Sequence, residues 1–99
     1  MFRVSVMYLR SDSSYFDLDY YENNHMPMVK SYIGKECKAV QIEMPLNEEQ
    51  PYHVLAHLLF ESLESFQKSY MPHSVAIKED VKNYTNIVPL VQMGIVTDI

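Results

Sequence analysis

Four segments of the chain have the alternation of apolar and polar residues, or the enrichment in β-branched residues, that is typical of β-strands. They are residues 2–9, 37–44, 52–60 and 87–96. Pro89 lies inside the last segment. Because proline cannot donate to a sheet ladder, it predicts an edge strand or a bulge there.

Two longer segments between these strands have helical features. The first begins at Asp17, whose side chain can cap the backbone, and is expected to run to about Gly34. Glycine is expected to end this helix in the left-handed conformation. The second begins at the cap Ser62 and is expected to reach about Tyr84. Each helix therefore lies between two strands.

The resulting order is β-α-β-β-α-β, in a single domain that spans residues 1–99. Because parallel βαβ crossovers are right-handed, two of them interlock into a four-stranded antiparallel sheet with both helices on one face. This fold class is α+β, with the ferredoxin-like architecture.

The two halves of the chain contain a weak internal repeat with an offset of 45 residues. A cap, an apolar residue, an acid, an inward aromatic residue and a Met-Pro pair recur in both helices. The corresponding segments are Asp17-Leu18-Asp19 and Ser62-Leu63-Glu64, Tyr21 and Phe66, and Met26-Pro27 and Met71-Pro72. Two βαβ halves related by a pseudo-twofold axis explain this repeat.

The sheet face away from the helices has a mixed character. Strand alternation assigns to the helix side Phe2, Val4, Val6, Tyr8, Tyr52, Val54, Ala56, Leu58 and Phe60. It assigns to the opposite face Arg3, Ser5, Met7, Leu9, His53, Leu55, His57 and Leu59. The second set is too apolar for bulk water and too polar for a sealed core, which is typical of an interface between subunits. We therefore expect a homodimer through this face, with an inner β-barrel and outer helices.

Composition excludes several classes of partner. The net charge of -5 and the scattered eight Lys and Arg residues disfavour nucleic-acid binding. No run of 18 apolar residues could span a membrane, and the first residues lack the features of a signal peptide. The single cysteine, Cys37, excludes an internal disulfide and fits a reducing cytoplasm. The expected location is therefore cytoplasmic.

The first helix combines a titratable ring with a helix breaker. Tyr21 and His25 lie one turn apart on its inward stripe, and Pro27 follows. Pro27 removes the hydrogen bond to the Asn23 carbonyl and is expected to push Met26 away from helical angles. The helix should therefore kink or restart near His25.

The second helix repeats this combination. His73 follows Pro72 on a stripe that includes Phe66 and Tyr70. The two kinks are expected to hold the helices away from the sheet and to leave a pocket lined by both His25 and His73.

His25 and Tyr21 suggest proton chemistry in that pocket. A neutral imidazole has a pKa near 6.5 and can exchange a proton at cellular pH. A phenol one turn away can donate a hydrogen bond to a developing oxyanion. Such a pair could enolise a carbonyl, close a ring or deprotonate a phenol. The alternative is structural, with His25 bonding the freed carbonyl and stabilising the kink.

Metals and cofactors have no visible anchor in the sequence. His53 and His57 are four residues apart on a strand, which separates them by roughly 13 Å, so interface packing explains them better than a metal site. Cys37 has no basic neighbour that would activate a thiolate. With Gly34 and Gly94 as the only glycines, no phosphate-binding loop is present. No metal and no nucleotide, flavin or pyridoxal cofactor is expected.

Three stretches of the chain carry a family resemblance: FDLDYYENNHMPM at 16–28, HLLFESLESFQ at 57–67 and MPHSVAIKEDVKNYTNIVPLVQ at 71–92. They resemble the EthD-type proteins, which are named for ethyl tert-butyl ether degradation and belong to the dimeric α/β-barrel superfamily. The resemblance implies a ferredoxin-like subunit, a homodimer, and binding of small apolar molecules between the sheet and its helices. The superfamily includes cofactor-independent monooxygenases, muconolactone isomerases, polyketide cyclases and haem-degrading enzymes.

The residues and the resemblance together favour a cofactor-free oxidoreductase of monooxygenase type that acts on a small apolar or aromatic substrate. Asp17, Tyr20, Tyr21 and His25 match the first motif, and His73 matches the second. The expected catalytic residues are His25 as base, Tyr21 as oxyanion donor, and His73. The expected substrate-binding residues are Asp17, Tyr20, Met28, Phe66 and Tyr70. The alternatives are a polyketide cyclase or isomerase, and a non-catalytic accessory or carrier protein.

Overall fold

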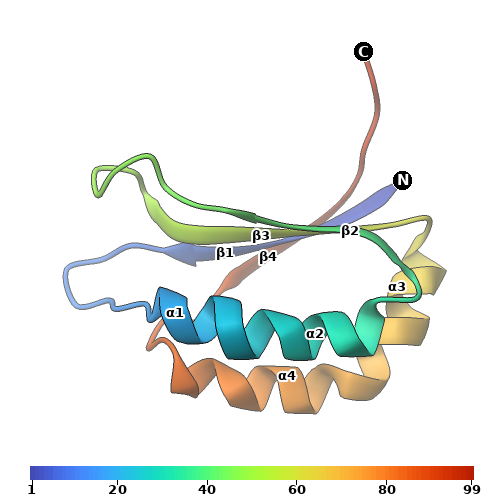
Figure 1. The fold of residues 1–99 in the computed structure, drawn as a ribbon. Helices are drawn as coiled ribbons and strands as arrows, with labels where there is room; N and C mark the ends of the chain where they lie inside the picture. Colours follow the sequence, from blue (N-terminus) through green and yellow to red (C-terminus); the bar gives the residue numbers. More distant parts are fainter.

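The computed structural model describes residues 1–99, and it has an antiparallel four-stranded sheet with helices on one face (Figure 1). The strands are β1 (Phe2–Leu9), β2 (Cys37–Glu43), β3 (Tyr52–Phe60) and β4 (Leu90–Ile95). Their order across the sheet is β2-β3-β1-β4. This confirms the ferredoxin-like architecture. The last strand begins directly after Pro89 and lies at the edge of the sheet.

The first helical segment is continuous and contains a π-helical turn. Its parts are α1 (Leu18–Tyr20), the π-turn (Tyr21–His25) and α2 (Met26–Ile33). The Asp17 carboxylate accepts a hydrogen bond from the Tyr20 N–H at 3.1 Å, which confirms the predicted cap.

The expected restart near His25 is present, because α2 begins at Met26, but the expectation that Pro27 pushes Met26 away from helical angles is wrong. Met26 keeps helical angles, with φ -67° and ψ -38°, and its N–H bonds the carbonyl of Tyr21, five residues back. The wider π-turn relieves the clash that a proline ring makes with the preceding turn, so the chain continues as a helix.

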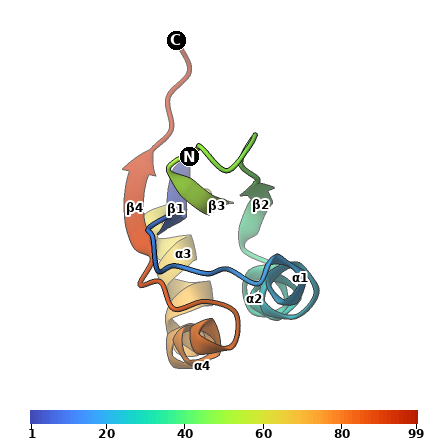
Figure 2. The ribbon, with the colours of Figure 1, turned by 90° about the vertical axis from the view of Figure 1, so that its left-hand side faces the viewer.

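The second helical segment is bent. It contains α3 (Leu63–Tyr70), a 3₁₀ turn (Met71–His73), α4 (Ser74–Asp80) and a second 3₁₀ turn (Val81–Asn83). Figure 2 shows α4 end-on while α3 is seen from the side, so the segment changes direction at the turn that contains Pro72. The kink predicted here is confirmed.

Gly34 ends α2 without the predicted left-handed conformation. Its φ of -57° and ψ of -30° are helical. A Cβ at this position would lie 2.7 Å from the Lys30 carbonyl oxygen, so the close approach of the backbone is what favours glycine.

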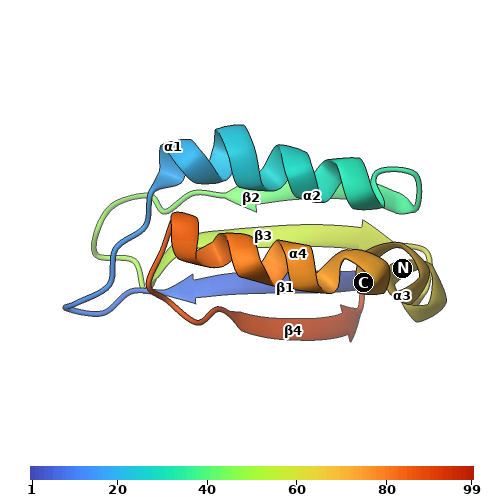
Figure 3. The same ribbon diagram turned by 90° about the horizontal axis from the view of Figure 1, so that it is seen from below.

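The core lies between the helices and the predicted side of the sheet. Alternate residues of β1 and β3 are buried there, as strand parity predicts; they include Phe2, Val4, Tyr8, Val54, Ala56, Leu58 and Phe60. On β4, Val91, Met93 and Ile95 are in register with Val6, Val4 and Phe2, yet they are 54, 50 and 73% exposed. Figure 3 shows β4 to the side of α4, at the edge of the layer. The helices therefore leave β4 uncovered.

Candidate active site

A cavity of about 110 Å³ lies between the helices and the sheet. Eleven of its 14 lining residues are hydrophobic. They come from β1, β3, β4, both helical segments and the connection before β4. The full set is Val6, Tyr8, Tyr21, His25, Met26, Val29, Ala56, Leu58, Tyr70, Ile77, Lys78, Val81, Pro89 and Val91. The cavity therefore lies in the predicted place, under the helices.

His25 is one of the few polar groups in this mostly apolar wall. It is the last residue of the π-turn and is only 3% exposed. The ring of Tyr21 stacks on it with centroids 5.5 Å apart and an interplanar angle of 17°. The π-turn thus sets two inward side chains on the same face, one above the other.

Asp80, at the end of α4, holds the other side of the His25 ring. His25 Nδ1 lies 2.9 Å from Asp80 Oδ2. The second carboxylate oxygen, Oδ1, accepts hydrogen bonds from the Tyr20 hydroxyl at 2.7 Å and from Asn83 Nδ2 at 2.9 Å. The orientation of the carboxylate is therefore fixed from both helical segments.

These contacts determine the protonation states of the pair. Burial lowers the pKa of His25, and the nearby Asp80 only partly opposes this effect. Burial raises the pKa of Asp80, but hydrogen bonds from Asn83, Tyr20 and His25 outweigh it and lower the pKa below its usual value. An ionised Asp80 needs a donor, so neutral His25 carries its proton on Nδ1 and leaves Nε2 as an acceptor.

Nε2 of His25 is the end of a chain of tyrosine hydroxyls. The Tyr84 hydroxyl lies 3.3 Å from Nε2 and 2.7 Å from the Tyr8 hydroxyl. With Nε2 as an acceptor, Tyr84 donates to His25 and Tyr8 donates to Tyr84. Burial raises the pKa of Tyr8 to about 12 and also raises the pKa of Tyr21 and Tyr84, so all three phenols stay protonated at neutral pH.

The structure brings three of the eight predicted site residues into the cavity: Tyr21, His25 and Tyr70. The other five lie outside its wall. Asp17 is an exposed cap, and Tyr20 holds Asp80. Met28 is half-buried beside the core, since the π-turn brings Met26 and Val29 to the inner face instead. Phe66 packs in the core against Phe2, Phe60 and Tyr70.

The expectation that His73 shares the cavity with His25 is wrong. His73 lies in the 3₁₀ turn after Pro72, where the bend directs it between the helices. Its ring stacks on Tyr32 of α2, with centroids 4.0 Å apart and an interplanar angle of 2°. It borders a surface groove with Lys35 and Lys68.

The sequence reasoning missed Asp80, Tyr84 and Tyr8. Asp80 and Tyr84 are 55 and 59 residues from His25 in the chain. At these separations, no helical or strand spacing indicates that Asp80 or Tyr84 contacts His25. A partial signal is that Asp80 lies three residues after the inward Ile77, next to the helix face that packs on the core.

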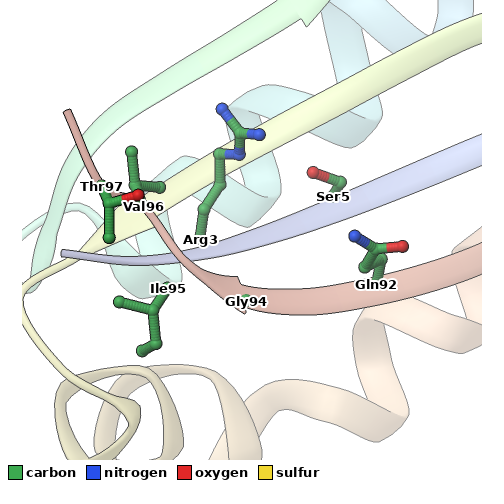
Figure 4. A pocket seen from close by; sticks show the side chains of 7 residues that line it. All are labelled: Arg3, Ser5, Gln92, Gly94, Ile95, Val96 and Thr97. Carbon is green, nitrogen blue, oxygen red and sulfur yellow. The ribbon is translucent and has the colours of Figure 1, made fainter. Parts of the chain in front are cut away.

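A second concave surface lies on the opposite face of the sheet. This groove of about 290 Å³ runs beside the C-terminal segment and is lined by Arg3, Ser5, Gln92, Gly94, Ile95, Val96 and Thr97 (Figure 4). Arg3 makes no ion pair. None of its residues contacts the His25 network, so the groove belongs to the open sheet face and not to the cavity.

No group of three or more His, Cys, Asp or Glu side chains is placed to hold a metal ion. The two histidines on the outer sheet face have separate partners: His57 lies 3.1 Å from Ser5 Oγ, and His53 lies 2.9 Å from Ser14 Oγ. None of the helices is long and apolar enough to cross a bilayer.

The fold and the cavity define a ferredoxin-like α+β domain with a small apolar chamber and a buried histidine that is paired with a partly exposed aspartate. Residues 13–87 match the EthD domain, so the chain belongs to the EthD family. Comparison with curated proteins gave no match.

Solved structures agree with this assignment. The chain is 31% identical to an EthD-like protein from Ralstonia eutropha JMP134, with a TM-score of 0.82 over 94% of this chain and 88% of that one. An ethyl tert-butyl ether degradation family protein from Bacillus halodurans C-125 has 12% identity and a TM-score of 0.76, over 98% and 99% of the two chains. At this lower identity the likeness shows the fold.

A protein from Shewanella loihica PV-4, assigned provisionally as a monooxygenase, shares the fold with 9% identity and a TM-score of 0.65, over 99% and 96% of the two chains. Two other ferredoxin-like neighbours are described as dimeric.

Proposed function

We propose that the protein is an enzyme that removes a proton from a small apolar or aromatic substrate, with His25 as the general base. The observation that carries this proposal is the orientation of the buried His25 ring. Asp80 binds Nδ1 at 2.9 Å, while the ring itself lines an apolar cavity. The ring is thus neutral, held in one tautomer and placed in the wall of an apolar cavity under the helices.

Substrate would compete with Tyr84 for Nε2. The 3.3 Å contact between Nε2 and the Tyr84 hydroxyl is long for a hydrogen bond that involves a hydroxyl. An acidic O–H or C–H group of a bound substrate can therefore replace it at low cost. The proton would move to Nε2, and the ionised Asp80 would stabilise the imidazolium.

Tyr21 would stabilise the charge that develops on the substrate. It lines the cavity beside His25, and burial raises the pKa of its phenol, so it remains a donor. A protonated donor fixed in a dry site can stabilise an oxyanion without reorganisation. Tyr70, on the opposite helical segment, would hold the far side of the substrate.

The favoured overall reaction is a cofactor-free oxidation of monooxygenase type. An activated CH₂ group next to a phenol or carbonyl loses a proton to His25, and the resulting enolate donates electrons to O₂ to form a carbon-bound hydroperoxide. Loss of water converts this carbon to a ketone, so CH₂ and O₂ give C=O and H₂O. The substrate supplies all four electrons. This choice follows the assignment given to the Shewanella loihica protein, which shares the fold.

The test is oxygen uptake and product formation with a panel of single-ring phenols, quinols and cyclic 1,3-dicarbonyl compounds. His25→Ala is expected to lower turnover by roughly 10²- to 10⁴-fold, the usual contribution of a general base. His73→Ala is the matched control, since it removes a histidine beside a proline outside the cavity, and its turnover should remain within about twofold of wild type.

Equal turnover in the wild type and His25→Ala would contradict the proposal. Turnover without oxygen uptake would assign the protein to the cyclases or isomerases. Retention of a ligand with no turnover and no dependence on pH would identify a carrier.

We also propose that the protein is a homodimer through the sheet face away from the helices. A polar row crosses this face in register: Gln41, His57, Ser5 and Gln92. Apolar residues flank it, namely Met7, Leu9, Leu55, Leu59 and Leu90. This mixture is typical of an interface, and the dimeric neighbours support it. Light scattering is expected to give twice the 11.6 kDa mass of the chain. A monomer mass at micromolar concentration would contradict the proposed homodimer.

A further inference from the structure

We propose that the cavity accepts an organic acid of about one ring, with its carboxylate at the mouth paired to Lys78. This inference rests on the proposed function of the same cavity and extends it by naming the substrate class. Three properties of the cavity support it: its volume, the position of its mouth and its charge.

The volume limits the substrate to about one ring. The cavity measures about 110 Å³, which is smaller than the roughly 150 Å³ of an apolar protein cavity that holds benzene, so one ring is the most that it can enclose and a carboxylate on that ring would have to lie at the mouth. The inner wall includes buried Leu58, Val29 and Tyr8, whose side chains pack in the core. A second ring would have to displace such residues, so it is expected to remain outside.

The mouth of the cavity lies between α4 and β4. Among the lining residues, Lys78 and Val91 are exposed, while Val81 and Pro89 are half-buried. The remaining lining residues are buried or half-buried around His25. Substrate that enters from the uncovered side of β4 therefore passes Lys78 before it reaches the ring of His25.

Lys78 is the only formally charged side chain in the wall, since His25 is neutral. It makes no ion pair, although acidic residues outnumber basic ones by 13 to 8 in the chain. No acidic residue lines the cavity. The aliphatic stem of a lysine can pack against the apolar mouth while its ammonium group reaches solvent. The mouth thus presents one uncompensated positive charge next to an apolar chamber.

This arrangement would also orient the substrate. A carboxylate held at the mouth places the opposite edge of an aromatic ring deepest in the cavity. That inner end of the cavity contains His25 and Tyr21. A hydroxyl or activated carbon para to the carboxylate would then face the base, which restricts deprotonation to one position.

The test is calorimetric binding of three probes at low ionic strength: 4-hydroxybenzoate, the neutral isostere 4-hydroxybenzamide, and phenol. Wild type is expected to bind the benzoate about two- to fivefold more tightly than the amide, the size expected of one partly exposed ion pair. Lys78→Met keeps the stem and removes the charge, so it should abolish this preference and leave phenol binding unchanged. Lys78→Arg should keep the preference.

Lys30→Met is the matched control, because Lys30 is an exposed lysine of α2 that makes no ion pair and does not line the cavity. It should bind all three probes as wild type does. Equal affinities for acid and amide, an acid preference that persists in Lys78→Met, or no binding of any probe would each overturn the inference.

The variant His25→Ala separates this inference from the proposed function. It should lose turnover and keep the preference for the acid, since the base and the anion site are different groups. If the preference is absent but neutral phenols are turned over in a His25-dependent manner, the ligand class is wrong and the proposed function stands. If the preference for the acid is present but no substrate is turned over, the ligand class stands and the proposed function is wrong.

Discussion

The two helical segments are copies of one pattern, but only one of them carries a buried histidine. Both begin at a side-chain cap, and both contain a Met-Pro pair at the same position in the repeat. In the first, His25 precedes the pair; in the second, His73 follows it. With the 45-residue offset, His25 corresponds to Tyr70, and His73 corresponds to Met28.

The structure follows this correspondence. His25 and Tyr70 both line the cavity, whereas Met28 and His73 both lie outside it. For these two pairs the position in the repeat agrees with the face that the side chain occupies, but Met26 is buried while its counterpart Met71 is 54% exposed, so the agreement does not extend to the whole repeat. The prediction placed His73 on the stripe of Phe66 and Tyr70 by assuming an uninterrupted α-helix, and the 3₁₀ turn at Met71–His73 breaks that spacing.

The two prolines are also accommodated differently. A five-residue π-turn precedes Pro27 and keeps the first segment continuous. A three-residue 3₁₀ turn contains Pro72 and bends the second segment. The wide turn presents His25 to the core, while the bend swings α4 so that Asp80 reaches His25. Both distortions thus contribute to one site.

After the loss of His25 itself, the largest expected effect on turnover comes from Asp80→Asn, which changes the contact that only the first histidine makes. The amide can donate to Nδ1 of His25, which moves the ring proton to Nε2 and removes the acceptor. Turnover should fall by about 10²-fold or more, as it does when an orienting carboxylate is neutralised in other histidine-dependent enzymes.

¹⁵N NMR of the His25 ring would show the change of tautomer, which a merely structural role for Asp80 would not produce. Asp80→Glu should restore part of the turnover. An unchanged tautomer in Asp80→Asn would exclude a positioning role.

A smaller effect is expected from Tyr84→Phe. The substitution leaves the buried Tyr8 hydroxyl without its 2.7 Å partner, so the free energy of unfolding should fall by about 1–3 kcal/mol. Tyr15→Phe is the control, because Tyr15 is 53% exposed. Urea denaturation measures both. Equal stability of the two variants would mean that the tyrosine chain contributes nothing to the fold.

The pH dependence of stability tests the burial of His25. Because burial lowers its folded pKa, the unfolded state binds more protons below about pH 6.5, and stability should decrease as pH falls from there toward the folded pKa. This group contributes a slope of at most about 1.4 kcal/mol per pH unit. The lowered pKa of Asp80 affects stability in a separate pH range, below about pH 4, where the unfolded state binds this proton first.

The variant His25→Gln should flatten the slope between pH 7 and pH 5. His53 contributes with the same sign, since burial and then Arg10 lower its pKa, so the difference between variant and wild type is the measurement. An identical slope in the two proteins would show that His25 titrates as it does in the unfolded chain.

The smallest effect is expected for His73, the histidine of the second helical segment. His73→Ala removes the stack on Tyr32, which should cost about 0.5–1.5 kcal/mol of stability. Turnover should match the wild type, because His73 does not line the cavity. A loss of turnover comparable to that of the Asp80 variant would show that the two histidines act together, contrary to their positions.

Local patterns predicted the fold well, because strand alternation and capping act over a few residues. The bounds of β1 and β3 agree with the sequence prediction, and Asp17 and Ser62 cap their helices. The conformation around Pro27 and Gly34 could not be read locally, since a π-turn and a close backbone approach are alternatives to the usual break and left-handed cap.

The site was only partly predictable for a different reason. His25 and Tyr21 lie on one helix turn, so periodicity identifies them. Asp80 and Tyr84 meet them only through the packing of the two helical segments and the bend between α3 and α4. A pattern within either segment contains no information on that angle.

The π-turn accommodates one extra residue in the first helical segment. Glu22, Asn23 and Asn24 are exposed, so substitutions there should be tolerated. Deleting one of them would convert the turn to an ordinary α-turn, in which the N–H of Met26 still bonds the carbonyl of Tyr21, so the residues that follow would keep their orientation relative to Tyr21. A one-residue gap at this place in a relative would therefore shorten the outer face of the helix and leave the inner face of α2 in register with the chamber.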